Sequence, residues 1–376
     1  MRMNIYQRLG LKRVINASGK MTILGVSSVA AEVMQATAEA AASFVEIDEL
    51  VDRVGQLISQ HTGAEDSYVT SCASAGIVIA VAAAVTRGEP DLVAQLPDSQ
   101  GLANQIVMLR GHNIDYGAPI TSAIRLGGGK VIEVGQSNLS YRWQLEKAIS
   151  SDTAALLYVK SHHCVQKGMV ALKDFVEVAQ NYHLPLIVDA AAEEDLRAYV
   201  AAGASMVIYS GAKALDAPTS GFITGQEQWI CHCKAQHNGI ARAMKVGKEN
   251  MVGLVMAMER YQTHQPDWAQ QLPELKQIAQ KISTIAGFQA DIEQDEAGRA
   301  IYRIRVKVDA SQLGLNAVEV EELLRTGDVA IYTRHYFLHQ GVFSFDPRGL
   351  KNDDFALIVA RLQEISQLSG AQHAAN

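Results

Sequence analysis

Between about residues 46 and 225 the sequence alternates short apolar runs with helix-like segments, and this alternation restricts the chain to few folds. Helix-like patterns such as those at 141–149 and 172–182 lie between several of the apolar runs. Strands that alternate with helices indicate a parallel sheet covered by helices. We therefore expect an α/β domain with a mostly parallel seven-stranded sheet, its strands at 67–70, 105–109, 131–134, 154–159, 185–188, 206–209 and 221–224.

The segments before and after this region indicate how the chain divides into domains. A length of 376 residues is large for a single core and suggests two domains. We expect an N-terminal arm and helix at 1–45 and a large domain at 46–262, which ends in a long helical stretch. Beyond it the pattern changes to helix, strand and helix, with strands at 300–308 and 329–332. The sequence therefore predicts a smaller C-terminal α+β domain at 263–376.

Asp189 and Lys213 stand where such a sheet would bring them to one edge. Asp189 ends the uncharged run 184–188, and Lys213 follows the run 206–209 after a turn of small residues. Pyridoxal 5'-phosphate (PLP) fits this pair, because its aldehyde forms a Schiff base with a lysine and its ring nitrogen pairs with a carboxylate. Taken singly, Asp189 could cap a helix and Lys213 could be a solvated loop residue. Their order and spacing together favour the cofactor.

Two turns of small residues are candidates for the cofactor phosphate. Ser74-Ala75-Gly76 lies between a strand and an alanine-rich helix, where backbone N–H groups and the helix dipole favour an anion. An ordinary serine-capped helix explains the same residues without a ligand. Ser210 is the second candidate, about one helical turn before Lys213.

Further candidates follow other strands, and their roles stay open. His112 could lie flat on the cofactor ring and Arg110 could hold an anion, although a loop histidine is more often solvated. His163 follows another strand at the same edge, and ligands bind beyond the carboxyl ends of such strands. Glu193 or Glu194 could be a catalytic acid, or both could be solvated acids in the first turn of a helix.

Charge and cysteine content exclude several classes of protein. A formal net charge of −7 without a Lys/Arg run argues against a nucleic-acid-binding surface.

The apolar stretch 77–85 is shorter than a membrane span, and the first residues lack the apolar region of a signal peptide, so we expect a cytoplasmic protein without membrane contact. Four cysteines are too few for a disulfide framework. The clusters 162–164 and 231–233 lack the usual spacing of zinc ligands, so we expect no metal site.

A substrate that carries both a carboxylate and a phosphate would need at least two cationic anchors. Arg334 is the preferred carboxylate ligand among the C-terminal residues. Arg348 is the alternative, although it could instead pair with Asp346 in a purely structural turn. The distal phosphate is left to Arg110, Arg242 or Lys245.

The chain resembles the selenocysteine synthase branch of the fold-type-I PLP enzymes, and within it the ammonia-lyases that act on D-glucosaminate 6-phosphate. The matching segments span nearly the whole sequence; they are Val14-Ile15-Asn16-Ala17-Ser18-Gly19, Leu186-Ile187-Val188-Asp189, Ser210-Gly211-Ala212-Lys213, Pro218-Thr219-Ser220-Gly221-Phe222-Ile223-Thr224-Gly225, Arg242-Ala243-Met244-Lys245-Val246-Gly247-Lys248 and Asp346-Pro347-Arg348.

This resemblance implies that Lys213 holds PLP, that Asp189 pairs with its ring nitrogen, and that the turn 74–76 and Ser210 bind its phosphate. It further implies a homodimer or larger homo-oligomer, with 16–20 and 238–248 as candidate interface segments. The implied activity is the conversion of D-glucosaminate 6-phosphate to 2-keto-3-deoxygluconate 6-phosphate and ammonia.

Two departures from selenocysteine synthase bear on function. Residues like Asn16 to Gly19 come almost at the start of this chain, so we expect the additional tRNA-binding domain of the bacterial synthase to be missing. The synthase has Ser-Gly-Asp-Lys where this chain has Ser210-Gly211-Ala212-Lys213, and this favours the ammonia-lyases. The alternatives are another PLP reaction on an amino acid, such as racemisation or aldol cleavage, and a synthase-like protein that binds aminoacyl-tRNA.

Overall fold

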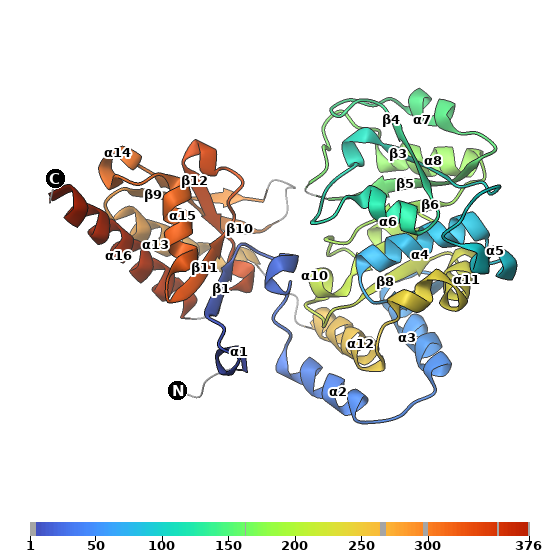
Figure 1. The fold of residues 1–376 in the computed structure, drawn as a ribbon, viewed down its shortest axis with the longest axis horizontal. Coiled ribbons are helices and arrows are strands. Elements are labelled where there is room, and N and C mark those ends of the chain that lie inside the picture. Colours follow the sequence, from blue (N-terminus) through green and yellow to red (C-terminus); the bar gives the residue numbers. More distant parts are fainter. Residues whose placement is uncertain (1–4, 162, 264–267, 296–299, 352, 375–376) are drawn as a thin grey trace. The chain divides into compact units, whose positions relative to one another are not determined.

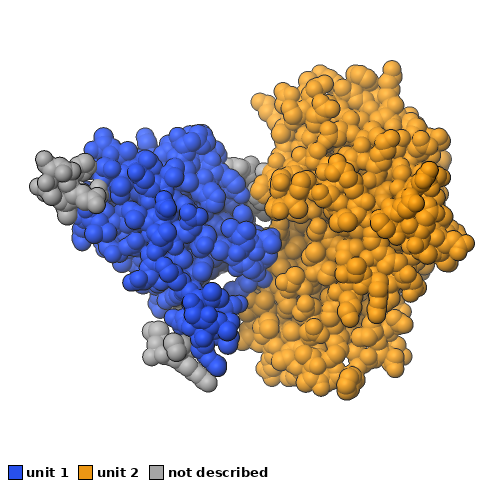
Figure 2. Space-filling view, in the orientation of Figure 1, with its two compact units in different colours: residues 1–28, 265–376 blue, residues 29–264 orange. Residues whose placement is uncertain are grey.

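The computed structural model describes residues 5–161, 163–263, 268–295, 300–351 and 353–374. The chain divides into two compact units, one of residues 29–264 and one of residues 1–28 with 265–376 (Figure 2). The division near residue 264 lies close to the boundary expected at 262. The arm expected at 1–45 is shared between the two units, because its first strand pairs within the C-terminal one.

A seven-stranded sheet forms the centre of unit 29–264 (Figure 1), with the strand order β2-β8-β7-β6-β5-β3-β4. Strands β4, β3, β5, β6 and β7 run parallel, whereas β8 is antiparallel to both neighbours. The mostly parallel sheet is therefore confirmed. Its strands are β2 Asp66–Thr70, β3 Gln105–Leu109, β4 Lys130–Val134, β5 Thr153–Val159, β6 Leu186–Asp189, β7 Met206–Ser210 and β8 Gly221–Gly225.

Helix α4 (Ala73–Thr86) packs on one face of this sheet. It is apolar on all sides and almost wholly buried, because α6 (Ile120–Leu126) and α11 (Glu227–Ala235) cover it from outside. The other face packs against the apolar stripes of α3, α8 and α12. The remaining helices of this unit are α2 Ala31–Ala41, α3 Ile47–Thr62, α5 Pro90–Gln95, α7 Arg142–Ala148, α8 Leu172–Asn181, α9 Ala198–Ala201, α10 Gly211–Leu215 and α12 Lys248–Thr263.

The second unit contains two small sheets. Strand β1 (Arg13–Ala17) pairs in parallel with β11 (Val329–Thr333), and β10 (Tyr302–Val308) lies antiparallel between β9 (Phe288–Gln294) and β12 (Val342–Phe345). Helices α13, α15 and α16 enclose a core of aliphatic and phenylalanine side chains. The helices here are α1 Ile5–Arg8, α13 Leu272–Ser283, α14 Ala310–Leu313, α15 Ala317–Thr326 and α16 Asp354–Ala374. Among the described residues, no helix has the length and apolar character needed to cross a bilayer.

Candidate functional site

Strands β3, β5, β6 and β7 end at one edge of the large sheet, and the predicted site residues follow them there. Asp189 lies between Val159 of β5 and Ile208 of β7 in the strand register. At the same edge Gly221 pairs with both Ser210 and Thr70, which brings the end of β2 and the start of α4 beside the end of β7. Ligands bind beyond the carboxyl ends of such strands, so this edge is the candidate site.

Asp189 is the buried carboxylate of this edge, with only 5% of its surface exposed. Its Oδ1 accepts a 3.1 Å hydrogen bond from the backbone N–H of Ala191. Burial raises the pKa of Asp189 to about 6, against the opposing effects of that hydrogen bond and of the Lys213 charge. A cation placed against Asp189 would therefore be favoured, because it would relieve the cost of burying the charge.

Lys213 is fixed near this carboxylate by the short helix α10. The hydroxyl of Ser210 accepts a 3.2 Å hydrogen bond from the Lys213 backbone N–H and caps the helix. Burial lowers the pKa of the Lys213 amine, while the nearby Asp189 raises it. The lysine therefore has more neutral amine at neutral pH than a solvated one, which is what a nucleophile or a base requires.

The start of α4 offers free backbone donors. Cys72 caps the helix, since its Sγ and its carbonyl oxygen accept from the N–H groups of Ala75 and Gly76. Within the described part of the chain, the N–H groups of Ala73 and Ser74 have no acceptor. Together with the Ser74 hydroxyl, they form an arrangement suited to a phosphate oxygen.

Two glycines allow this close geometry. A Cβ at Gly221 would lie 2.6 Å from the carbonyl carbon of Cys72 and 2.7 Å from the nitrogen of Ala73, so only glycine lets β8 approach the start of α4. A Cβ at Gly76 would lie 2.8 Å from Cγ2 of Ile208. Gly76 therefore also serves helix–sheet packing, a role that the sequence analysis did not anticipate.

The acidic segment after Asp189 is held by three tyrosines. Glu193 Oε2 accepts a 2.9 Å hydrogen bond from the hydroxyl of Tyr199, and the backbone oxygens of Glu194 and Asp195 accept from Tyr261 and Tyr209. Tyr199 and Tyr209 belong to the core on the sheet face opposite α4. Asp189 follows Val188 of that core, and successive side chains of a strand alternate between faces, so Asp189 points to the α4 face. The carboxylate of Glu193 therefore lies toward the face opposite α4, whereas that of Asp189 points to the α4 face.

The structure does not support the expected stacking of His112. The side chain is 0% exposed, its Nδ1 accepts a 3.3 Å hydrogen bond from the Val159 N–H, and its ring meets the Tyr158 ring edge-on at 4.7 Å. A ring this deeply buried is a weaker candidate for stacking on the cofactor than an exposed one. Burial lowers the pKa of His112 to about 4, so the imidazole is neutral.

The other predicted residues of this unit lie at the surface. His163 is exposed, and Arg110 is half exposed and forms a 3.4 Å ion pair with Glu133. Arg242, in the short 3-10 helix Ile240–Met244, and Lys245, which follows that helix, are exposed before α12. No group of His, Cys, Asp or Glu side chains within the described ranges is arranged to hold a metal ion, and His162 of the cluster 162–164 lies outside those ranges.

Arg334 and Arg348 belong to the other unit, where they differ sharply. Arg348 is bound on Asp346 through two 2.9 Å hydrogen bonds, and buried Arg303 bridges Asp346 and Asp295 at 2.8 Å and 2.7 Å. Arg348 therefore pairs with Asp346 in the turn that the sequence left open as an alternative, and this row of two arginines and two aspartates is formally neutral.

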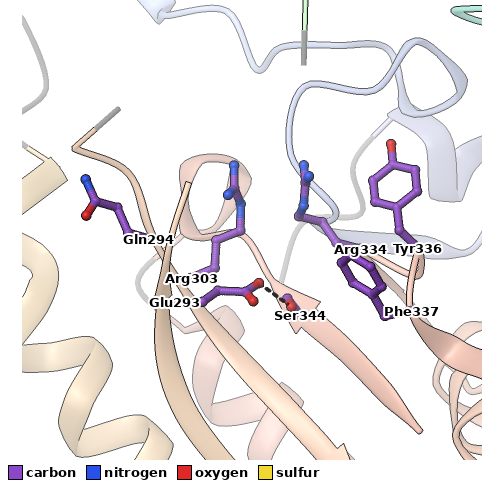
Figure 3. Close-up of a pocket in the computed structure, with 7 residues that line it drawn as sticks. All are labelled: Glu293, Gln294, Arg303, Arg334, Tyr336, Phe337 and Ser344. Carbon is purple, nitrogen blue, oxygen red and sulfur yellow. Dashed lines mark hydrogen bonds between the residues drawn. The ribbon is translucent and has the colours of Figure 1, made fainter. Parts of the chain in front are cut away.

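Arg334 lies in a pocket beside this row, and its guanidinium has no ion-pair partner among the described residues. The charged end of Arg334 lies 5.2 Å from the centre of the Tyr336 ring. Its side chain extends in the same direction as Arg303 (Figure 3), while the Ser344 hydroxyl donates to Glu293 at the pocket floor. Burial and the Arg303 charge lower the pKa of Arg334. Among the described residues, the Arg334 guanidinium in this pocket has no ion-pair partner, so an anion bound to it would be favoured.

The donor set at the sheet edge fits PLP. It combines a buried carboxylate that a pyridinium would stabilise, a lysine inclined to the neutral form, and helix N-terminal amides without an acceptor in the described ranges. Tyr116 is a residue that the sequence analysis missed: its hydroxyl lies 3.1 Å from that of Ser74. A single tyrosine in a loop has no local signal by which sequence could identify it.

Comparison with known proteins gives consistent results. The family model "SelA: L-seryl-tRNA selenium transferase" matches residues 14–346. The D-glucosaminate-6-phosphate ammonia lyase of Salmonella typhimurium (strain 14028s / SGSC 2262) is 69% identical over 99% of both chains. A 5'-C-glycyluridine monooxygenase-decarboxylase of a Streptomyces species is 41% identical over 96% of this chain and 91% of its own.

Solved structures show the same relationships. A structure of D-glucosaminate-6-phosphate ammonia-lyase, 69% identical, has a TM-score of 0.94 and covers 98% of this chain and 100% of its own. A serine palmitoyltransferase from S. paucimobilis with bound PLP is only 14% identical but has a TM-score of 0.57 over 95% of this chain and 89% of its own. The fold is therefore that of the fold-type-I PLP enzymes, as expected.

Proposed function

The chain belongs to the SelA family, and from this premise we propose that it is a PLP-dependent ammonia-lyase acting on D-glucosaminate 6-phosphate. The products are 2-keto-3-deoxygluconate 6-phosphate and ammonia. The observation that carries the proposal is the 69% identity, over 99% of both chains, to an ammonia lyase named for that substrate. Asp189, Lys213 and the start of α4 supply what the cofactor of such a reaction needs.

PLP, when bound, supplies a protonated pyridine ring that draws electrons from the substrate Cα. In our proposal Asp189 keeps the proton on the ring nitrogen, and Ser210 with the residues 74–76 binds the phosphate. Lys213 holds the cofactor at rest and then takes the Cα proton on Nζ, a task that its lowered pKa favours.

The departing 3-hydroxyl also needs a proton. Lys213 Nζ can deliver the proton that it has just taken, so that one water leaves from C2 and C3. Glu193 is less suited, because its carboxylate accepts from Tyr199 and lies toward the opposite face of the sheet. Glu194 and His163 remain alternatives. The resulting enamine becomes an imine and takes up one water, so the net products are the 2-keto acid and ammonia.

We propose Arg334 as the ligand of the substrate carboxylate. Its support is chemical: the guanidinium is unpaired among the described residues, whereas Arg348 is already bound on Asp346. Arginine presents a planar fork that matches a carboxylate. The distal phosphate is assigned to Arg242 or Lys245 ahead of Arg110, because Arg110 is paired with Glu133.

A homo-oligomer in the cytoplasm completes the proposal. Four apolar side chains around α2 and the start of α3 are at least 40% exposed, and Phe44 is fully exposed, which suits burial against a second copy; these are Met34, Phe44, Val45 and Ile47. The net charge of −7 favours a protein that does not bind nucleic acid.

The direct test measures ammonia and 2-keto acid after the protein is incubated with PLP and D-glucosaminate 6-phosphate. D-Glucosaminate without the phosphate is the matched comparison, and we expect it to react much more slowly. Recovery of the substrate with its Cα inverted, and no ammonia, would show a racemase instead.

A second candidate is another reaction on the same scaffold. It is favoured by the 41% identical relative, whose name describes a monooxygenase-decarboxylase. Release of carbon dioxide, measured in the same incubation, separates the two. A gel shift with tRNA at physiological salt tests the synthase-like alternative, and we expect no shift.

A further inference from the structure

Tyr116 lies on a small loop that is held at the edge of the candidate site. The Ile120 N–H donates to the Ile114 oxygen at 3.0 Å, and Asp115 Oδ1 accepts from the Gly117 N–H at 2.8 Å. Ile114 and Ile120 are buried in the core beneath α4, and the Tyr116 ring packs against the same core. The loop therefore holds the Tyr116 hydroxyl in place beside the start of α4.

The hydroxyls of Tyr116 and Ser74 lie 3.1 Å apart, and either can be the donor. One of the two hydroxyls donates its proton to the other, and the proton of the accepting hydroxyl stays available for a further hydrogen bond. The N–H groups of Ala73 and Ser74, which have no acceptor among the described residues, lie at the same helix end. An anion there would be met by two amides and two hydroxyls, each of which can turn its proton toward it.

From this geometry we infer that Tyr116 is a ligand of the cofactor phosphate, with Ser74 as its partner. The inference rests on the proposed function, since it assumes that PLP occupies this edge. When the phosphate is absent, the two hydroxyls satisfy each other. When it is present, both donate to its oxygens.

The surroundings keep Tyr116 a donor. Burial raises the pKa of the phenol, and the negative charge of nearby Asp189 raises it further, while the hydrogen bond with Ser74 lowers it. Asp115 and Cys72 also face the phenol and raise its pKa. The hydroxyl therefore keeps its proton at neutral pH and can donate it to an anion.

The test compares PLP with pyridoxal, which lacks the phosphate. Cofactor-free wild-type protein and the Tyr116→Phe variant are titrated with each compound, and binding is followed by the visible absorbance. We expect Tyr116→Phe to raise the Kd for PLP about 10- to 100-fold, the range of a hydrogen bond to a charged group, and to leave the Kd for pyridoxal unchanged. Tyr182→Phe, at an exposed tyrosine, is the matched control.

Ser74→Ala provides a second variant that keeps the Tyr116 ring. We expect Ser74→Ala also to weaken the binding of PLP more than that of pyridoxal. The double variant should lose less PLP-binding free energy than the sum of the losses in the two single variants, because the two hydroxyls bind one group. Equal weakening of PLP and pyridoxal by Tyr116→Phe would place Tyr116 at the ring instead and overturn the inference. Unchanged PLP binding would also overturn it. Wild-type protein that binds no PLP would refute the proposed function itself, which distinguishes the two failures.

Discussion

The Ser210 hydroxyl accepts a 3.2 Å hydrogen bond from the backbone N–H of Lys213, which ties the lysine to the end of β7. This contact fixes the stem of Lys213 one turn beyond the sheet, next to buried Asp189. A serine that caps so short a helix keeps its own hydroxyl proton for another acceptor. One residue thus positions the lysine and keeps a hydroxyl proton, which in our proposal is donated to the cofactor phosphate.

Replacement of Lys213 by Ala should abolish covalent attachment of PLP and nearly all turnover. The physical reason is that, among the described residues, Lys213 is the amine that lies near Asp189 with its pKa lowered by burial. Borohydride reduction followed by peptide mapping checks the attachment, and Lys281→Ala, at an exposed lysine of α13, is the control. A label on another lysine of the wild-type protein would contradict the assignment.

The cofactor-free protein should lose stability as the pH rises from 4 to 7, because of Asp189. The pKa of this carboxyl is raised from 3.8 to about 6 on folding. Between these values the unfolded chain has released the proton and the folded chain still holds it, so a rising pH favours unfolding. The loss is on the order of 3 kcal/mol in the free energy of unfolding, from the size of the pKa shift.

Urea unfolding at several pH values checks this, with Asp189→Asn as the reference that lacks the titration. The free energy of unfolding of the wild type should fall relative to that of Asp189→Asn across the window from pH 4 to 7. A difference that is constant with pH would mean that Asp189 is not destabilised by burial.

With PLP bound, Asp189→Asn should lower kcat by at least ~10³-fold, because an amide cannot hold the ring nitrogen protonated and the unpaired charge costs several kcal/mol. PLP content, measured by absorbance, should remain close to that of wild type. Normal turnover by this variant would place the essential carboxylate elsewhere.

The sequence predicted the large sheet better than it predicted the site or the second unit. Strand β7 is uncharged and fully buried, and β3 is uncharged and buried beyond Gln105, so their apolar runs mark their ends closely. Strand β9 was missed because it alternates polar residues on a half-exposed surface, and β12 was missed because Ser344 interrupts its short apolar run.

The residues of the candidate site were likewise predicted only in part. Asp189 and Lys213 could be found because each interrupts or follows an apolar run. The donation from Tyr199 to Glu193, the approach of Gly221 to the start of α4 and the position of Tyr116 are contacts across 6, 149 and 42 residues of chain, which local patterns do not record. The burial of His112 likewise depends on how its loop folds beneath Tyr158.

Phe44→Ser should weaken self-association. The Phe44 side chain is fully exposed between α2 and α3, and burial of a phenylalanine against a partner contributes roughly 1.5–3 kcal/mol. We expect the dissociation constant to rise about 10-fold or more, measured by sedimentation over a range of concentrations. Leu126→Ser, at an exposed leucine of α6, is the control. A fully active wild-type monomer would remove the need for a second copy.

Replacement of Arg334 and replacement of Arg348 should have different effects, the first on kinetics and the second on stability. Arg334→Ala removes a guanidinium without an ion-pair partner among the described residues, so the fold should lose little. We expect kcat/KM for D-glucosaminate 6-phosphate to fall at least ~10²-fold while PLP binding stays unchanged, since a charge-assisted pair in a closed site contributes roughly 2–4 kcal/mol.

Arg348→Ala instead leaves Asp346 with Arg303 as its remaining arginine in a buried row, where the loss of one partner is costly. We expect it to lower the free energy of unfolding by about 1–3 kcal/mol, the cost of a buried charged group that loses a hydrogen-bond partner. Thermal or urea unfolding gives the stability of both variants, and steady-state kinetics gives their kcat/KM, so that the two effects can be compared. Unchanged kinetics in Arg334→Ala, with a large kinetic loss in a stably folded Arg348→Lys, would assign the substrate carboxylate to Arg348, because a lysine can keep a charge beside Asp346 but cannot reproduce the bidentate fork.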